Sequence, residues 1–426
     1  MKEQADRIQP DEEIVAVYSM DVRRPENPQT KADLISTHTY PGTGTRVAGE
    51  SSEAREMYSG RVIEISELAP VIGRVPGDAQ GPTVEVRVGF PLRAFEDSVA
   101  MLLSVTAGEV LAYGGLRLVN LELPTSYVTS FKGPKFGIDG IRDQLGVRGR
   151  PFVLAIFKPS LGFLPEEGAI IFREAAIGGA DLIKDDELLS DPSYCRRSTR
   201  VRRYLEAERQ AFEETGEHTL YAVNITGKSD RVLANALEAA ELGANALMVN
   251  YLQVGLDVTR SICENPRVTL PVLGHNAGAS SFYGSRGTGM SMGLINGKLP
   301  RMCGLDLCVL LTQHGKFASV KEECIMTADE MRRASQTLRS TLPIAAGGVV
   351  PGLVPVLLSE YGPDCAIGSG GGIFGHPQGP RAGARAFRQA ITASLGHLDS
   401  ADVSDRFPEL RMALEKWGLD SPWRHR

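Results

Sequence analysis

From about Gln144 to the end of the chain, short apolar runs alternate with stretches of helical pattern. Each run ends in polar or glycine residues before the next helical stretch begins. Continuous apolar strands separated by helices are typical of a parallel sheet buried on both faces. The eight runs are Phe152–Phe157, Asp181–Ile183, Leu220–Ile225, Ala246–Asn250, Pro271–Gly274, Asp306–Leu311, Leu342–Ala346 and Asp364–Gly368. Eight such units predict an α/β fold that closes into a (β/α)8 TIM barrel.

The stretches between these runs carry the expected signals for helix ends. Pro165-Glu166-Glu167 predicts a helix start, because proline fits an early position and acids favour the positive end. Gly178-Gly179 predicts the end of that helix. Ser229-Asp230 predicts the start of another helix, and a last one is expected from Pro380 to about Leu395.

The first part of the chain has a different pattern. Residues 1–133 mix strand-like and helix-like segments, which predicts a smaller α+β domain of ferredoxin-like type before a barrel domain over residues 134–426. The predicted strands are Glu13–Val17, Arg61–Ile65 and Thr83–Val88, and the helical segments lie near Lys31–Ser36 and Glu96–Ala107.

The charge of the chain argues against a nucleic-acid partner. The sequence has 426 residues and a net charge of −6, whereas a phosphate-binding surface needs a basic excess. One arginine-rich stretch contains Arg196, Arg197, Arg200, Arg202 and Arg203. It runs into acidic residues with helical spacing, so we interpret it as a solvated helix face.

Cysteine usage and the N-terminus predict a cytoplasmic, soluble protein. The six cysteines show no C-x-x-C pair and no zinc spacing, so they are expected to be scattered reduced thiols. The N-terminal residues Met1–Asp6 are polar, so no signal peptide is expected. No apolar run approaches the length of a membrane span, so no membrane contact is expected.

Candidate chemistry follows the predicted strands, at the end where TIM barrels hold their active sites. Lys158 follows the first strand, and Lys184, Asp186 and Glu187 follow the second. The carboxylate oxygens of Asp186 and Glu187 suit Mg²⁺. The acidic run Asp185–Glu187 would equally suit a cap of the next helix. The residues alone leave both interpretations open. Further polar residues at later strand ends are Asn224, Thr226, Asn250, His275, Asn276, His314 and Lys316.

Glycine clusters follow the seventh and eighth predicted strands. They are Gly347-Gly348 and Gly370-Gly371-Gly372. Consecutive N–H groups without side chains form a nest for anions, and these two loops form a phosphate site in many TIM barrels. We therefore predict that they bind a phosphate group of the substrate.

At this point the residues resemble a known family. Gly178–Glu187 is similar to the RuBisCO segment whose carbamylated lysine binds Mg²⁺ with an aspartate and a glutamate. Other similar segments, in chain order, are Glu50-Ser51-Ser52, Phe90-Pro91-Leu92, Phe131–Pro134, Lys158-Pro159, Gly315-Lys316 and Gly370–Pro377. These matches extend along most of the chain, and the chain is identified as a member of the RuBisCO large-chain superfamily.

The departures from the carboxylase pattern concern the substrate. Ser160 stands where the carboxylase has a second lysine, and Glu109 where it has an asparagine. Asn276 replaces the arginine that holds the second phosphate, Val309 replaces a histidine and Ala346 a serine. A second phosphate dianion would be poorly compensated there. The resemblance is therefore to form IV, the RuBisCO-like proteins, which do not fix CO2.

The resemblance implies a magnesium centre and enolate chemistry. Asp186, Glu187 and a CO2-derived carbamate on Lys184 would hold Mg²⁺, which stabilises an enolate of the substrate. The carbamate or Lys158 would move the proton. Without the resemblance, Lys158 would be interpreted as a strand-end lysine that reaches out to water.

The resemblance also implies substrate contacts and a dimer. Lys316, and Glu50 from the partner subunit of a homodimer, would cover the substrate at the subunit interface. His275 would make a polar substrate contact. Without the resemblance, Lys316 would be interpreted as an exposed loop lysine.

Two groups of substrates are implied, each a small carbohydrate with one phosphate. RuBisCO-like proteins include decarboxylases or transcarboxylase/hydrolases of 3-oxo-isoapionate 4-phosphate, and enolases or isomerases of methylthio-sugar phosphates. The sequence shows no obvious apolar motif for a methylthio group, so we favour the sugar-acid phosphate. Two alternatives of other classes are a Schiff-base aldolase that uses Lys158 or Lys184, and a non-catalytic sugar-phosphate sensor.

Overall fold

The structure is a computed structural model that forms two compact units. The units are Met1–Phe131 with Gly278–Ile295, and Lys132–Ala277 with Asn296–Arg426. The predicted division lies at residue 133, and the first unit also takes in segment 278–295. The described residues are 13–22, 27–40, 42–43, 45–67, 83–285, 287–316, 320–398 and 405–419, so the prediction for Met1–Asp6 lies outside them.

The first unit contains a five-stranded sheet with strand order β10-β4-β1-β3-β2. The pairs among β1 to β4 are antiparallel, and the order β4-β1-β3-β2 is that of ferredoxin-like domains. The strands are β1 (Glu13–Asp21), β2 (Arg61–Glu67), β3 (Thr83–Pro91), β4 (Leu116–Glu122) and β10 (Thr288–Met290). The helices are α1 (Pro28–Thr37), α2 (Ser52–Tyr58), α3 (Val99–Thr106), α4 (Thr125–Val128) and α11 (Ser280–Tyr283).

The sequence pattern does not predict β4 or β10, for different reasons. In β4 the buried positions shift from Leu116 and Leu118 to Leu121, because a β-bulge interrupts the pairing with β1. The bulge breaks the alternation on which strand prediction depends. β10 is short and pairs in parallel with β4, where Thr288 lies opposite Leu116. It covers a sheet edge whose N–H and C=O groups would otherwise be unpaired.

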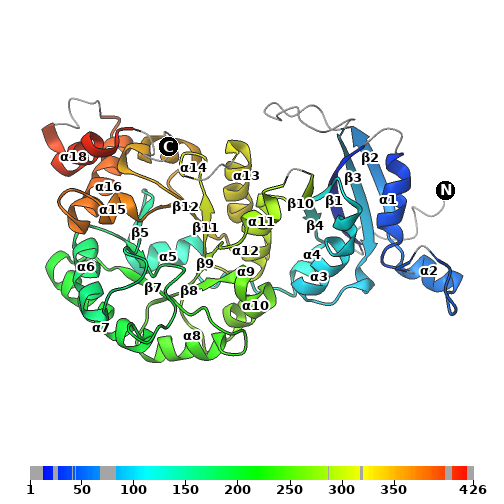
Figure 1. The fold of residues 1–426 in the computed structure, drawn as a ribbon, viewed down its shortest axis with the longest axis horizontal. Helices are drawn as coiled ribbons and strands as arrows, with labels where there is room; N and C mark the ends of the chain where they lie inside the picture. Colours follow the sequence, from blue (N-terminus) through cyan, green and yellow to red (C-terminus); the bar gives the residue numbers. More distant parts are fainter. Residues whose placement is uncertain are drawn as a thin grey trace. The chain divides into compact units, whose positions relative to one another are not determined.

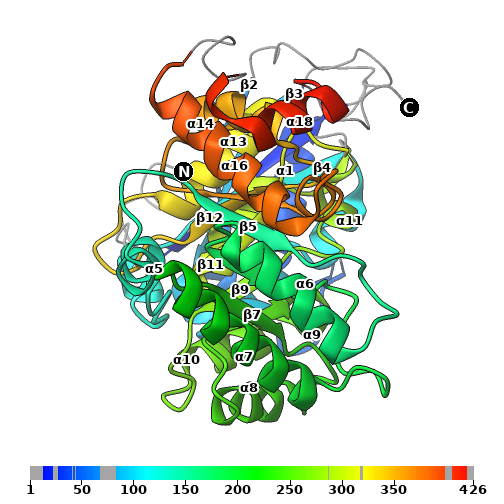
Figure 2. The ribbon, with the colours of Figure 1, turned by 90° about the vertical axis from the view of Figure 1, so that its left-hand side faces the viewer.

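The second unit is a closed barrel of parallel strands in the order β11-β12-β13-β5-β6-β7-β8-β9, which confirms the predicted TIM-barrel fold. Helices α6, α7, α8 and α16 lie outside the ring of strands in both ribbon views (Figures 1 and 2). The strands are β5 (Phe152–Ile156), β6 (Leu182–Lys184), β7 (Leu220–Asn224), β8 (Ala246–Asn250), β9 (Val272–His275), β11 (Leu307–Leu311), β12 (Leu342–Ala346) and β13 (Ala366–Ser369).

The helices of the second unit fall between and after these strands. The larger ones are α5 (Gly137–Leu145), α6 (Pro165–Ile177), α7 (Arg197–Thr215), α8 (Val232–Glu241), α10 (Leu256–Glu264), α13 (Lys321–Arg332), α14 (Val354–Tyr361), α16 (Pro380–Leu395) and α18 (Pro408–Trp417). Single turns of helix are α9 (Tyr251–Val254), α12 (Leu299–Met302) and α15 (Gly371–Phe374). As predicted, α6 begins at Pro165 and ends before Gly178.

Every second side chain of the barrel strands points inward and fills the core. The series on β5 is Phe152 and Leu154, and the series on β11 is Leu307 and Val309. All of these are buried in one apolar cluster with their counterparts from the other strands. The barrel is therefore a packed core that leaves only its rim for polar chemistry.

At the amino ends of the strands, hydrogen bonds to an Asp or Asn side chain connect neighbouring strands. We call each such contact a tie. In each case the residue directly before one strand accepts a hydrogen bond from a backbone N–H at the start of the adjacent strand. The pairs are Asp181 with Val153, Asn245 with Tyr221, and Asp306 with Val272, at 2.7, 2.7 and 3.0 Å. These ties set the register of three neighbouring strand pairs around the barrel.

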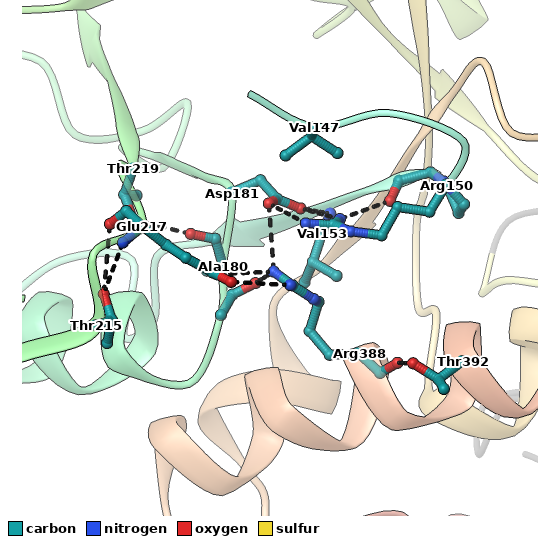
Figure 3. Close-up of polar contacts among 12 residues, drawn as sticks. Val147, Arg150, Val153, Ala180, Asp181, Thr215, Glu217, Thr219, Arg388 and Thr392 are labelled. Carbon is teal, nitrogen blue, oxygen red and sulfur yellow. Dashed lines mark hydrogen bonds and ion pairs between the residues drawn. The ribbon is translucent and has the colours of Figure 1, made fainter. Parts of the chain in front are cut away.

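The Asp181 tie is reinforced by two arginines (Figure 3). Both Asp181 oxygens accept from the Arg150 guanidinium at 2.7 Å, and Arg388 from α16 lies 3.4 Å from Oδ1. Asp181 is buried, whereas Arg388 also pairs with the half-exposed Glu217. The carboxylate therefore joins β5, β6 and α16.

None of the helices in the described ranges is both long and apolar enough to cross a membrane. Cys195, Cys263, Cys303, Cys308, Cys324 and Cys365 are free and buried, as expected for scattered thiols.

Replacement of Asp181 is expected to destabilise the barrel. Asp181→Ala leaves two arginines without their carboxylate and one strand N–H without its acceptor, which costs about 2–4 kcal/mol. The free energy of unfolding would be measured by urea denaturation. Glu217→Gln, which removes only the exposed partner of Arg388, should stay within about 0.5 kcal/mol of wild type. Equal stabilities of the two variants would contradict this role of Asp181.

Candidate active site

Every second side chain of the barrel strands points inward. At the carboxyl ends of β5 to β9, the inward-pointing side chains are polar. On β5 the apolar series leads to Lys158, and on β8 Ala246 and Met248 lead to Asn250. Apart from the partly exposed Lys158, these residues are largely buried. The residues that continue the inward series of β5 to β9 are Lys158, Lys184, Asn224, Asn250 and His275. Polar side chains of five consecutive strands therefore converge on one half of the rim.

A buried ion pair fixes the chain directly after β6. Asp185 and Arg200 have fully buried side chains, and Nη2 of Arg200 lies 3.0 Å from the carboxylate. The hydroxyl of Tyr221 and the backbone N–H of Asn224 also donate to Asp185, at 2.8 and 2.9 Å. Arg200 in turn donates to the carbonyls of two loop residues, Cys195 and Ser190. This network turns Asp185 away from the barrel interior.

Two sequence interpretations are wrong at this point. The arginine stretch is not one solvated face, because Arg197 and Arg200 are buried whereas Arg196 and Arg203 are exposed. The acidic run does not cap a helix either. A loop follows β6, and α7 begins only at Arg197. The backbone N–H of Arg197 donates a hydrogen bond to the Asp191 carboxylate.

Lys184 is the fully buried lysine of this rim. Its Nζ donates to the carbonyl of Asp185 at 2.9 Å and lies 3.3 Å from Oε2 of Glu187. Burial lowers the pKa of Lys184, and the nearby carboxylates of Glu187 and Asp186 oppose the shift only in part. The ammonium form is therefore less favoured here than in water.

Glu187 lies between Lys184 and a histidine from β9. Nε2 of His275 is 3.3 Å from Oε2 of Glu187. Burial and the Lys184 ammonium lower the pKa of His275 to about 3, so its imidazole is neutral at neutral pH. Burial alone would raise the pKa of Glu187, but the Lys184 ammonium lowers it to about 2. Asn250 donates to the Glu187 carbonyl at 3.1 Å, while its own buried Oδ1 accepts no hydrogen bond from any described residue.

Asp186 faces the lysine after β5. Nζ of Lys158 lies 2.5 Å from Oδ2 of Asp186, and Oγ of Ser160 donates to the same oxygen at 3.0 Å. Lys158 also donates to Ser160, at 2.9 Å. Lys158 therefore does not extend freely into water. Ser160 joins the lysine to the carboxylate, a role that its sequence position alone does not indicate.

The side chains of Lys184, Asp186 and Glu187 suit a metal ion only if Lys184 carries a carbamate. Within the described ranges, no group of three or more His, Cys, Asp or Glu side chains is placed to hold a metal ion. Asp186 and Glu187 instead face the ammonium groups of Lys158 and Lys184. A carbamate on Lys184 would place anionic oxygen beside both carboxylates, which is the ligand type that Mg²⁺ prefers.

The first glycine cluster lies beside the loop that carries Lys316. Gly347 and Gly348 have φ values of 103° and 93°, in the left-handed region that favours glycine. The N–H of Lys316 donates to the Gly347 carbonyl at 2.7 Å. A Cβ on Gly315 would lie 1.8 Å from that same oxygen, so only glycine permits this approach.

The second glycine cluster packs against Lys158 and the loop after β12. A Cβ on Gly370 would lie 3.0 Å from Cε of Lys158, and one on Gly372 would lie 2.7 Å from the Val349 carbonyl. A Cβ on Gly371, in contrast, would meet no atom within 4 Å. Open backbone is therefore present next to Lys158, as an anion-binding loop requires.

The remaining predicted residue, Glu50, belongs to the first unit. Its carboxylate accepts from Arg55 at 2.6 Å and from the N–H of Val47 at 2.9 Å. These two bonds, with the backbone contact first, lower the pKa of Glu50. Together with Thr37, Thr43, Thr45, Arg46, Ser51 and Ser52, Glu50 and Arg55 line a polar cavity of about 510 Å³.

Comparison with known proteins gives matches over both units. The family model of the ribulose bisphosphate carboxylase large chain, catalytic domain, matches residues 137–417, and that of its N-terminal domain matches residues 3–127. A ribulose bisphosphate carboxylase-like protein of Archaeoglobus fulgidus is 39% identical over 411 residues, covering 96% of this chain and 94% of the relative.

Two further matches are to a curated enolase and to a solved RuBisCO-like protein. A 2,3-diketo-5-methylthiopentyl-1-phosphate enolase of Bacillus licheniformis is 34% identical over 390 residues, covering 92% of this chain and 94% of the relative. The crystal structure of a RuBisCO-like protein from Alicyclobacillus acidocaldarius has a TM-score of 0.85 at 33% identity, covering 95% of this chain and all (100%) of that one. The matches in sequence and fold show that the chain belongs to the RuBisCO large-chain family, as a RuBisCO-like protein.

Proposed function

We propose that this RuBisCO-like protein is a Mg²⁺-dependent enzyme that forms an enolate from a singly phosphorylated, sugar-derived carbonyl compound. The observation that carries the proposal is the convergence of Lys184, Asp186, Glu187 and Lys158 at the carboxyl ends of β5 and β6. Fixation of CO2 onto a bisphosphate is not part of the proposal, because the residues for a second phosphate are replaced.

These replacements change the chemistry of one part of the barrel. Val309 and Ala346, which stand where the carboxylase has a histidine and a serine, belong to the apolar core cluster. A phosphate dianion beside them would lose its hydration without gaining a hydrogen-bond donor. The glycines of the β12 and β13 loops remain available for one phosphate group.

The side chains of the rim divide the chemical work. Mg²⁺ held by Asp186, Glu187 and a carbamate on Lys184 would polarise a substrate carbonyl and stabilise the developing negative charge. The carbamate or Lys158 would move the proton at the neighbouring carbon, and Ser160 holds the Lys158 amine on that side. Neutral His275 supplies a polar contact to the substrate without adding charge.

The first substrate candidate is a methylthio-sugar phosphate, as a substrate for enolisation. The sequence alone favoured the sugar-acid phosphate, because no apolar motif was apparent. Val309 and Ala346 leave no charged or hydrogen-bonding side chain at these two positions, which suits a substrate with one phosphate and an uncharged thioether end. The resemblance to a 2,3-diketo-5-methylthiopentyl-1-phosphate enolase at 34% identity supports the same candidate.

The second candidate is the decarboxylase or transcarboxylase/hydrolase of 3-oxo-isoapionate 4-phosphate. Loss of CO2 from a 3-oxo acid gives the same type of enolate without removal of a carbon-bound proton. Ser160 in place of a second lysine leaves one amine fewer at this end of the site, which suits a reaction that needs no additional base.

The proposed assembly is a homodimer in which Glu50 of the partner subunit reaches the substrate. The polar cavity around Glu50 supports this proposal, because its lining of arginines and hydroxyl groups suits a phosphorylated ligand. The Schiff-base aldolase and the sugar-phosphate sensor are the alternatives from other functional classes. Borohydride trapping of substrate on a lysine in the presence of EDTA would favour the aldolase over the metal enzyme.

The substrate assay tests the proposed function directly. With Mg²⁺ and bicarbonate in D2O, we expect the enzyme to exchange the proton next to the carbonyl of 2,3-diketo-5-methylthiopentyl-1-phosphate, as followed by ¹H NMR. Release of CO2 from 3-oxo-isoapionate 4-phosphate would instead support the second candidate. If neither compound reacts, both candidates are wrong.

Loss of the metal ligands is expected to abolish turnover. The metal supplies several kcal/mol, so Asp186→Asn or treatment with EDTA should lower kcat by about 10³-fold or more. Mg²⁺ should restore the EDTA-treated wild type but not the variant, as measured by the initial rate. Glu166→Gln, at an exposed carboxylate paired with Arg203, is the matched control and should keep wild-type activity. Full activity in EDTA would contradict the metal proposal.

Loss of the buried ion pair should impair the metal site indirectly. Arg200→Lys cannot reproduce the guanidinium contacts with Asp185, and we expect the affinity for Mg²⁺ to fall about 10–100-fold. Isothermal titration with Mg²⁺ would measure this affinity. Arg203→Lys, on the exposed part of α7, should leave it unchanged. A wild-type affinity in Arg200→Lys would show that the pair is not needed for the site.

A further inference from the structure

A carboxylate outside the proposed site holds the chain on both sides of Lys316. Glu360 lies near the end of α14, and its side chain is only 5% exposed. Among the described residues, the side chains that form ion pairs with Glu360 are those of His314 and Lys321. Neither belongs to the predicted metal ligands or to the glycine loops. The partners of Glu360 come instead from the segments that precede and follow residues 317–319.

The preceding segment contributes two side chains. Nε2 of His314 lies 3.0 Å from both carboxylate oxygens of Glu360. Nε2 of Gln313 donates to Oε1 at 3.2 Å. Both residues lie in the loop between the end of β11 and Lys316, so Glu360 fixes the approach of the chain to this lysine.

The following segment contributes a cation. Nζ of Lys321, the first residue of α13, lies 3.1 Å from Oε1 of Glu360. Burial would raise the pKa of Glu360, but the hydrogen bonds from His314 and Lys321 lower it. The carboxylate is therefore anionic at neutral pH and can hold both segments at once.

The backbone at Lys316 is held from a second direction. Its N–H donates to the Gly347 carbonyl at 2.7 Å, and Gly315 leaves no room for a side chain at that contact. The backbone of Lys316 is therefore connected directly to the β12 loop and, through His314, to Glu360. A shift of His314 would move the backbone of Lys316 with it.

We propose that Glu360 is a positioning residue that acts through Lys316. By binding His314 before this lysine and Lys321 after it, Glu360 sets where the Lys316 amine meets the substrate. The inferred effect on turnover rests on the proposed function, because it assumes that Lys316 meets the substrate. The structural connection between Glu360 and Lys316 does not depend on that function. A misplacement on the order of 1 Å can cost about 10²-fold in rate, so a remote carboxylate can matter for catalysis.

Hydrogen exchange tests the structural connection without any substrate. In Glu360→Gln and Glu360→Ala, the amide of Lys316 should exchange at least about tenfold faster than in wild type, as local opening becomes easier. Amides of β5 and β6 should keep their protection. Glu322→Gln, at an exposed acid of the first turn of α13, is the matched control and should show no change. Unchanged exchange at Lys316 in both Glu360 variants would overturn the proposal.

A double-mutant cycle tests whether Glu360 acts through the lysine. Glu360→Gln should lower kcat/KM about 10–100-fold in wild type, and have no further effect in a Lys316→Ala background. Affinity for Mg²⁺ should be unchanged in Glu360→Gln. Independent, additive effects of the two substitutions would overturn the proposal. If no substrate reacts, the proposed function fails, and the exchange measurement still decides whether Glu360 holds Lys316.

Discussion

The buried ion pair between Asp185 and Arg200 is the constraint on which the rest of the site depends. It turns one acidic side chain outward, toward α7, where its charge is neutralised by a guanidinium and by two further donors. Because the pair is fully buried, loss of either partner would leave an uncompensated charge in the core. The fixed direction of Asp185 leaves Lys184 pointing inward and Asp186 facing Lys158, so one ion pair orders the neighbouring functional groups.

This order gives the rim two chemically different halves. Strands β5 to β9 end in lysines, carboxylates, amides and a neutral histidine. β11 is followed by the loop of His314 and Lys316, and β12 and β13 are followed by glycine loops, whereas Val309 and Ala346 belong to the buried core. The polar residues of β5 and β6 support the proposed metal site, and the glycine loops after β12 and β13 support the proposed site for one phosphate group.

Much of this arrangement could be predicted from the sequence, because its determinants are local. The apolar runs predicted every barrel strand, and Lys184, Asp186 and Glu187 form one contiguous motif. The burial of Arg200 does not follow from charge alone, because its neighbours Arg196 and Arg203 are exposed. Its spacing from Val201, Tyr204 and Ala207 on one helix face would have indicated it. The pairing of β10 with β4 and the bond between Ser160 and Asp186 join distant segments, which spacing along the chain does not reveal.

The most direct test of the metal centre is a measurement of the carbamate itself. The chain would be incubated with ¹³C-labelled bicarbonate and Mg²⁺, and its ¹³C NMR spectrum recorded for wild type, Lys184→Met and Lys158→Met. The account predicts a Mg²⁺-stabilised carbamate resonance in wild type and Lys158→Met that is missing from Lys184→Met. A resonance that persists in Lys184→Met, or none in wild type, would contradict it.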